Sequence, residues 1–132
     1  MIAVDTNIIV RLMINDNAKQ VSKARSLIVE NNIAITSGVL IETVWVLGQT
    51  YELDRPAIAR SLAALLALPN IAAPWPGSVQ SLLDCFLAGM DFADVVHLLD
   101  AKALGCNKLA SFDEKLRKQA AKRTIDIDVI AP

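Results

Sequence analysis

The sequence predicts an α/β protein in which helices cover both faces of a parallel sheet. Two observations support this class: short apolar runs alternate with longer stretches of helical periodicity, and 54% of the 132 residues are hydrophobic. The alternation is typical of strand–helix–strand units, and the high apolar content indicates that most elements are buried on at least one side. The length suits a single domain over residues 1–132 with a sizeable core.

The chain begins with a strand that leads directly into a helix. Residues 2–4 are apolar and end at Asp5, and Thr6 and Asn7 are suitable N-caps for a helix whose apolar residues recur at helical spacing. Asp5 therefore lies at the carboxyl end of a strand, which is the edge where open α/β sheets bind ligands. Alternatively, Asp5 only caps the helix, and this residue alone does not decide between the two interpretations.

Similar patterns predict the remaining elements. The helix over residues 37–51, which Ser37 is expected to cap, is apolar nearly all round and should therefore be buried. Pro69, Gly89 and Gly105 end three of the later helices. The expected strands are residues 2–4, 33–36, 71–73, 108–111 and 125–130. After the helix that opens at Thr6, the expected helices are residues 18–32, 37–51, 55–68, 78–88, 92–104 and 113–122.

The net charge and composition of the chain limit the classes of protein to which it can belong. A net charge of −1 gives no argument for a nucleic-acid or membrane partner. The N-terminus lacks the basic region of a secretory signal, so we expect a cytoplasmic protein. Cys85 and Cys106 have no metal-binding spacing and suit buried thiols in a reducing compartment. Residues 61–83 carry no charge, but prolines and a glycine interrupt them, and we expect no membrane span.

Acidic residues occur in apolar segments that contain no bases. Glu42 is the only charged residue between Ile33 and Glu52, and no Lys or Arg occurs over residues 26–54. Burial of an unpaired carboxylate costs several kcal/mol or shifts its pKa strongly. A second segment, residues 61–101, has four aspartates and again no Lys or Arg. A divalent cation is the simplest partner for such acids.

Two further aspartates complete the candidate site. Asp94 lies at the start of a helix, where Asp91 competes for the N-cap, so we assign Asp94 to chemistry and Asp91 to capping or support. Asp113 follows a strand and begins a helix, which repeats the geometry of Asp5. Ser111 and Asn7 are expected to hold the acids or a bound water. The acids expected to converge in a hard-cation site at one sheet edge are Asp5, Glu42, Asp94 and Asp113.

In their order and spacing, four motifs resemble the PIN-domain ribonucleases, and within them the VapC toxins of toxin–antitoxin pairs. The motifs are Asp5-Thr6-Asn7, Glu42 in an apolar helix, Asp91-Phe92-Ala93-Asp94 with His97, and Ser111-Phe112-Asp113. The resemblance implies a three-layer α/β/α sandwich around a parallel sheet of about five strands. It also implies that the four acids are catalytic and bind Mg²⁺ or Mn²⁺, with Thr6, Asn7, Asp91 and Ser111 in support. Where this chain has Ser111 the family more often has Thr, which keeps the hydroxyl.

By this resemblance the chain is a metal-dependent endoribonuclease, the toxin of a VapBC-like pair whose partner is a VapB-like antitoxin. The bound cation would lower the pKa of water and neutralise charge on the phosphate. Bases are concentrated in the last third of the chain, where Lys108, Lys115 and Lys118 either contact RNA or form a solvated surface. The apolar content also predicts a homodimer.

Other interpretations fit less well. A haloacid-dehalogenase phosphatase needs a second Asp at the position of Asn7, and a response-regulator receiver needs an Asp at the end of the third strand, where Pro74 follows two alanines. A PIN nuclease that processes RNA outside a toxin–antitoxin pair and a non-catalytic PIN scaffold stay open. His97 is interpreted as structural, and Trp45 and Trp75 as core or interface residues.

Overall fold

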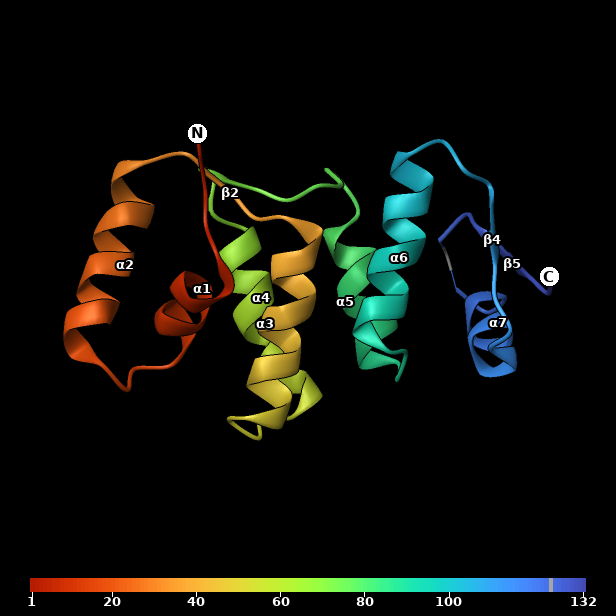
Figure 1. Cartoon of the computed structure of the whole chain (residues 1–132), viewed down its shortest axis with the longest axis horizontal. Helices are drawn as coiled ribbons and strands as arrows, with labels where there is room; N and C mark the ends of the chain where they lie inside the picture. The colour runs from red at the N-terminus through yellow and green to blue at the C-terminus, as the bar shows by residue number, and fades with distance from the viewer. Residues whose placement is uncertain (124) are drawn as a thin grey trace. The chain divides into compact units, whose positions relative to one another are not determined.

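The computed structural model describes residues 1–123 and 125–132 (Figure 1). By their internal contacts these residues form two compact units, residues 1–74 and residues 75–132, and each unit is described by itself.

The first unit has a parallel sheet with two helices in each crossover connection. Its strands are β1 (Ile2–Ala3), β2 (Ile33–Ala34) and β3 (Ile71–Ala72), in the order β1-β2-β3. Between these strands lie α1 (Thr6–Met13), α2 (Ala18–Glu30), α3 (Ser37–Gln49) and α4 (Arg55–Leu66). Because successive strands are neighbours and parallel, all three end at the same edge of the sheet.

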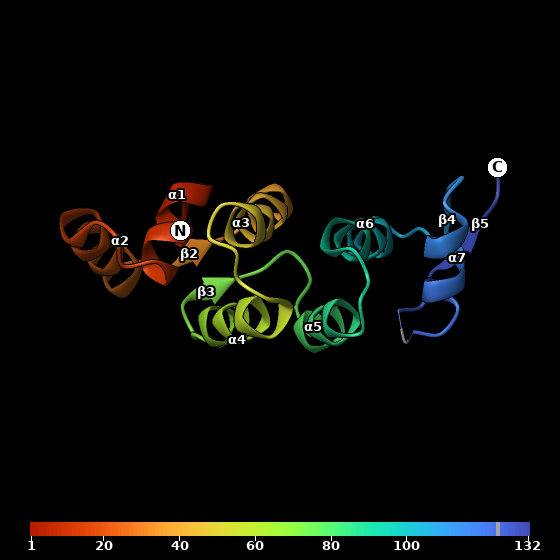
Figure 2. The ribbon, with the colours of Figure 1, turned by 90° about the horizontal axis from the view of Figure 1, so that it is seen from below.

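The helices of this unit bury their apolar faces against one another and against the sheet. Helix α1 lies between α2 and α3, and α3 also packs against α4 (Figure 2). Three helices and the central strand each contribute fully buried side chains to this core. They are Ile9 of α1, Leu40 and Leu47 of α3, Leu62 of α4 and Ile33 of β2. This packing sets the position of the loops that follow β1 and β2.

The second unit contains α5 (Val79–Leu87), α6 (Phe92–Ala103), β4 (Lys108–Ala110), α7 (Glu114–Ala120) and β5 (Asp128–Ile130). Strands β4 and β5 pair in parallel, with Lys108 opposite Asp128. Helix α5 packs against α6, and Phe86 and Phe92 meet edge to face with ring centroids 5.5 Å apart. The Trp75 indole is buried, and its Nε1 donates to an Asp100 carboxylate oxygen at 2.7 Å.

In the part of the chain that the structure describes, five strands and seven helices lie where the sequence predicts them, and their ends differ by up to three residues. Among the described residues the strands form one parallel sheet of three strands and another of two, so a single sheet of about five strands is not confirmed. The strands are only two or three residues long. The uncharged residues 61–83 are divided among α4, β3 and α5. No helix in the described part of the chain has the length and apolarity needed to cross a membrane.

Two local predictions were wrong. The N-cap of α3 is Thr36, whose Oγ1 accepts from the Val39 amide at 3.4 Å, where we expected Ser37. The N-cap of α1 is Asp5, which was one of the two interpretations left open for that residue. Helix α3 is also not buried all round, since its neighbours cover one side and Trp45 on the other side is 63% exposed. High hydropathy therefore did not mean burial on every side of this helix.

Candidate active site

Asp5 lies in the turn between β1 and α1, at the carboxyl edge of the three-stranded sheet. Its Oδ1 accepts a hydrogen bond from the Ile8 amide at 3.2 Å, which is the N-cap contact of α1. The side chain is exposed, and its second oxygen has no hydrogen-bond partner among the described residues. Asp5 therefore caps the helix with one oxygen and presents the other to solvent, so the two interpretations of this residue are compatible.

Glu42 lies in the second turn of α3, the helix that follows β2. Because β1 and β2 are adjacent and parallel, α1 and α3 begin at the same edge of the sheet, and the two helices pack against each other. The prediction that Glu42 is buried was wrong: it is exposed on the face of α3 opposite Leu40 and Leu47. Within the described chain the Glu42 carboxylate makes no hydrogen bond or ion pair.

Asp94 lies in the first turn of α6 and is half-buried. The N-cap of this helix is Asp91, whose Oδ1 accepts from the Asp94 amide at 3.0 Å. Partial burial raises the pKa of the Asp94 carboxyl, and the charges of Asp91 and Asp113 raise it further, whereas His97 acts in the opposite direction. The second unit therefore places Asp94 in a negative field.

Asp113 lies in the turn between β4 and α7, where three hydrogen bonds hold the backbone. The Asp113 amide donates to Oγ of Ser111 at 3.0 Å, and Oδ1 of Asp113 accepts from the Leu116 amide at 3.0 Å. A guanidinium nitrogen of Arg117 donates to the Ser111 carbonyl oxygen at 2.9 Å. Phe112, between these two residues, is 88% exposed.

Sequence reasoning gave Phe112 and Arg117 no individual role. The sequence shows that Phe112 is an aromatic residue next to a candidate acid, and this signal could have pointed to it. The sequence does not show that its side chain is exposed. Arg117 was counted only as one of several bases, because its contact with Ser111 depends on the geometry of the first turn of α7.

The other predicted residues occupy different environments. Thr6 is buried at the start of α1, whereas Asn7 is exposed beside it. Lys108, Lys115 and Lys118 are exposed on β4 and α7. The two tryptophans were predicted to be core or interface residues, and the structure places Trp75 in the core. His97 is exposed on α6.

The structure thus brings the acids together in two sets. Asp5 and Glu42 belong to one sheet edge of the first unit, and Asp94 lies in the field of Asp91 and Asp113 in the second. Among the residues that the structure describes, no three His, Cys, Asp or Glu side chains stand close enough to hold a metal ion. Convergence of all four predicted acids stays a prediction. The chemistry of the donors nevertheless fits Mg²⁺ or Mn²⁺, because all four are carboxylates and an acid in a negative field favours a cation.

An α/β chain with carboxylates at the ends of parallel strands belongs to the broad class of folds that bind charged ligands at the sheet edge. Comparison with protein families narrows this class. Residues 2–122 match the PIN domain family, and the chain belongs to that family. PIN-domain proteins are generally nucleases that act on RNA, typically with Mg²⁺. A comparison with curated proteins finds no match for this chain.

Proposed function

We propose that the protein is a single PIN domain over residues 1–132 that hydrolyses RNA phosphodiester bonds as a Mg²⁺- or Mn²⁺-dependent endoribonuclease. The observation that carries the proposal is the match of residues 2–122 to the PIN domain family, whose members are generally nucleases. Asp94 supports it, because this half-buried acid lies in the field of two further acids, Asp91 and Asp113. Like charges near a partly buried carboxylate disfavour its ionised form, and a bound cation would relieve this repulsion. Asp5 at the end of β1 has the strand-end position that the same site requires.

Asp5, Glu42, Asp94 and Asp113 would hold the metal. When bound, the divalent cation neutralises charge that develops on the phosphate and lowers the pKa of the attacking water. The protein's own contribution is positioning. Ser111 and Asp91 hold the backbone amides of Asp113 and Asp94, and Thr6 and Asn7 begin the helix that Asp5 caps.

RNA contacts are proposed for the exposed surface around the β4–α7 turn. Lys108, Lys115 and Lys118 supply positive charge for the phosphate backbone, and Phe112 supplies an aromatic face on which an unpaired base can stack. An aromatic side chain that is 88% exposed has no packing role to explain it. Single-stranded RNA is therefore the favoured substrate.

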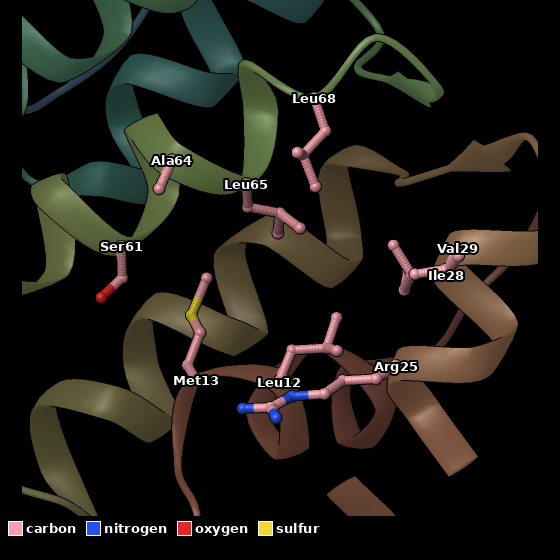
Figure 3. A pocket seen from close by; sticks show the side chains of 9 residues that line it. All are labelled: Leu12, Met13, Arg25, Ile28, Val29, Ser61, Ala64, Leu65 and Leu68. Carbon is pink, nitrogen blue, oxygen red and sulfur yellow. The ribbon is translucent and has the colours of Figure 1, made fainter. Parts of the chain in front are cut away.

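The toxin assignment is a finer proposal, and a groove in the first unit supports it. This groove has a volume of about 530 Å³ and lies among α1, α2 and α4 (Figure 3). Its lining consists of Leu12, Met13, Arg25, Ile28, Val29, Ser61, Ala64, Leu65 and Leu68. An apolar groove with one cation suits an amphipathic helix that carries an acidic residue, and we assign it to a VapB-like antitoxin.

The groove assignment can be tested by co-purification with the product of a short neighbouring gene. Leu68→Glu, at the groove, should weaken capture, whereas Leu87→Glu, on α5, should not; Leu68 is 41% exposed and Leu87 50%. A homodimer is proposed because large apolar side chains such as Trp45 and Leu104 are exposed. Sedimentation that shows only monomer at micromolar concentration would refute the dimer.

Nuclease activity is tested by incubating single-stranded RNA with Mg²⁺, Mn²⁺ or a chelator. Cleavage should require the metal, and Asp5→Asn, Glu42→Gln and Asp113→Asn should each reduce it by more than the roughly 10- to 100-fold typical of residues that only support metal ligands. Asp84→Asn changes an exposed acid of α5 and should cleave normally. If Asp5→Asn cleaved RNA at the wild-type rate, the assignment of Asp5 would be contradicted. If neither the wild type nor any variant cleaved RNA in the presence of metal, a non-catalytic scaffold would be favoured.

A further inference from the structure

A second concave surface in the first unit lies directly beside Asp5. It is a cleft of about 480 Å³ between α1 and α2, the two helices that pack side by side in Figure 2. Asp5, Asn7 and Arg11 border it from α1 and the turn before it, and Gln20 and Lys23 border it from α2. The volume is in the range of sites that bind small organic ligands.

The polar residues of the cleft, apart from Asp5, are all able to donate hydrogen bonds. Arg11 Nε donates to Oε1 of Gln20 at 2.7 Å, and a second nitrogen of the same guanidinium pairs with Asp16. Arg11 is thereby held in place, and the amide N–H groups of Gln20 are left for another acceptor. The ammonium group of Lys23, three residues after Gln20, makes no ion pair or hydrogen bond with any described residue.

Between these donors lies an apolar floor formed by Ile8, Ala24 and Leu27. Ala24 is 2% exposed, and its small side chain lets the two helices approach closely below the cleft. An apolar lining with donors and a cation beside it suits a ribose or base with its attached phosphate. The carboxylate of Asp5 is the one anionic group in the lining.

We propose that this cleft binds the nucleotide next to the cleaved phosphodiester bond of RNA. The phosphate of that nucleotide contacts Lys23 and the Gln20 amide, and its sugar or base lies on Ile8 and Leu27. The occupant is an RNA segment because Lys23 is complementary to phosphate and because the cleft continues directly to Asp5. The assignment rests on the proposed ribonuclease function and adds a substrate subsite on α2, far along the chain from the bases around Asp113.

The test is RNA binding rather than cleavage. In an Asp113→Asn background, which prevents turnover, fluorescence anisotropy measures the affinity for a labelled single-stranded RNA in Mg²⁺ at several salt concentrations. Lys23→Ala is compared with Lys19→Ala, which removes the same charge from the same exposed helix but does not line the cleft. Alanine is a good helix former, so both variants should fold.

Lys23→Ala should weaken binding roughly tenfold and reduce the slope of log affinity against log salt by about 0.7, the value for one phosphate contact on a single strand. Lys19→Ala should change both quantities much less. Equal effects of the two variants would overturn the subsite and leave the ribonuclease proposal intact. An Asp113→Asn protein that binds no RNA, together with a wild type that cleaves none, would overturn both proposals.

Discussion

The Asp113 backbone amide donates a hydrogen bond to Oγ of Ser111 at 3.0 Å, so a hydroxyl two residues earlier holds the turn that presents this carboxylate. The carboxylate itself accepts from the Leu116 amide at the start of α7. Position and direction of Asp113 are therefore set by two short local contacts, which the chain can form as soon as β4 and α7 are in place.

Removal of the Ser111 hydroxyl should loosen this turn. We expect Ser111→Ala to lower kcat/KM for RNA cleavage about tenfold and the free energy of unfolding by about 1 kcal/mol, the typical value of one hydrogen bond. Ser111→Thr keeps the hydroxyl and should retain both properties. If Ser111→Thr were as impaired as Ser111→Ala in steady-state assays, the hydroxyl would not be the cause.

Phe112 should affect RNA affinity without affecting stability. Because the ring is 88% exposed, Phe112→Ala loses little packing and should melt within about 1 °C of the wild type. Loss of one base-stacking contact should weaken RNA binding about tenfold, and Phe112→Trp should restore it. Leu104→Ala, which removes another exposed apolar side chain, serves as the control in the same anisotropy assay. Unchanged affinity of Phe112→Ala would exclude stacking.

The sequence predicted the location of each helix and strand, because periodicity and chain breakers act locally. It failed where several local solutions compete. Asp5, Thr6 and Asn7 are all good N-caps, and only the backbone geometry of the turn shows that Asp5 accepts from the Ile8 amide. The exposure of Trp45 and Glu42 was missed for a related reason: hydropathy along α3 does not say which of its sides α1 and α4 will cover.

Pairing between distant strands is less predictable still. The parallel pairs β1-β2 and β4-β5 join segments separated by a helix or more, and two or three residues of apolar sequence carry little information about their neighbours. The four acids were selected from sequence without knowledge of the pairing, Glu42 and Asp94 because they stand in apolar segments without Lys or Arg, and Asp5 and Asp113 because they follow strands. Their common role in one metal site stays a prediction. The contact of Arg117 with Ser111 carried no such signal.

Thr43 offers a test of packing next to Glu42. Its side chain is fully buried in α3, and its Oγ1 has no hydrogen-bond partner among the described residues. A buried hydroxyl without a partner costs about 1–3 kcal/mol. Thr43→Val has nearly the same shape and should raise the free energy of unfolding by about 1 kcal/mol in urea titrations, with Thr43→Ser lowering it through a lost methyl group. A less stable valine variant would mean that the hydroxyl has a partner in solution.

Asp16, in the loop between α1 and α2, accepts hydrogen bonds from Arg11 near the end of α1 and from Tyr51 just after α3. Partial burial raises the pKa of the Asp16 carboxyl, but hydrogen bonds from Arg11 and Tyr51 outweigh this effect and lower it below 3.8. A lowered folded-state pKa stabilises the protein above the unfolded-state pKa, and this stability is lost as the pH falls through the folded-state pKa. Asp16→Asn should therefore melt below the wild type at pH 7, and the difference should vanish in strong acid. Glu30→Gln, an exposed acid on α2, should show no such loss.

The contribution of Asp94 to stability should depend on pH in the opposite direction from that of Asp16. Its pKa is raised by partial burial and by the charges of Asp91 and Asp113, so protonation is easier in the folded protein than in the unfolded chain. The stability that comes from this shift is present below the unfolded-state pKa and is lost as the pH rises through the folded-state pKa. At pH 7 the ionised carboxylate is a net burden on the metal-free fold.

Asp94→Asn removes that charge at nearly constant shape. The metal-free variant should melt at or above the wild-type temperature at pH 7, and the difference should shrink as the pH approaches about 4. Its cleavage activity should be lost. Mg²⁺ or Mn²⁺ should stabilise the wild type by mass action and the variant much less. The measurement is thermal melting of both proteins with chelator and with excess metal. If Asp94 were salt-bridged, the variant would leave a base unpaired and would melt below the wild type. A lower melting temperature of the variant in chelator, together with an unchanged response to metal, would therefore contradict the metal site at Asp94.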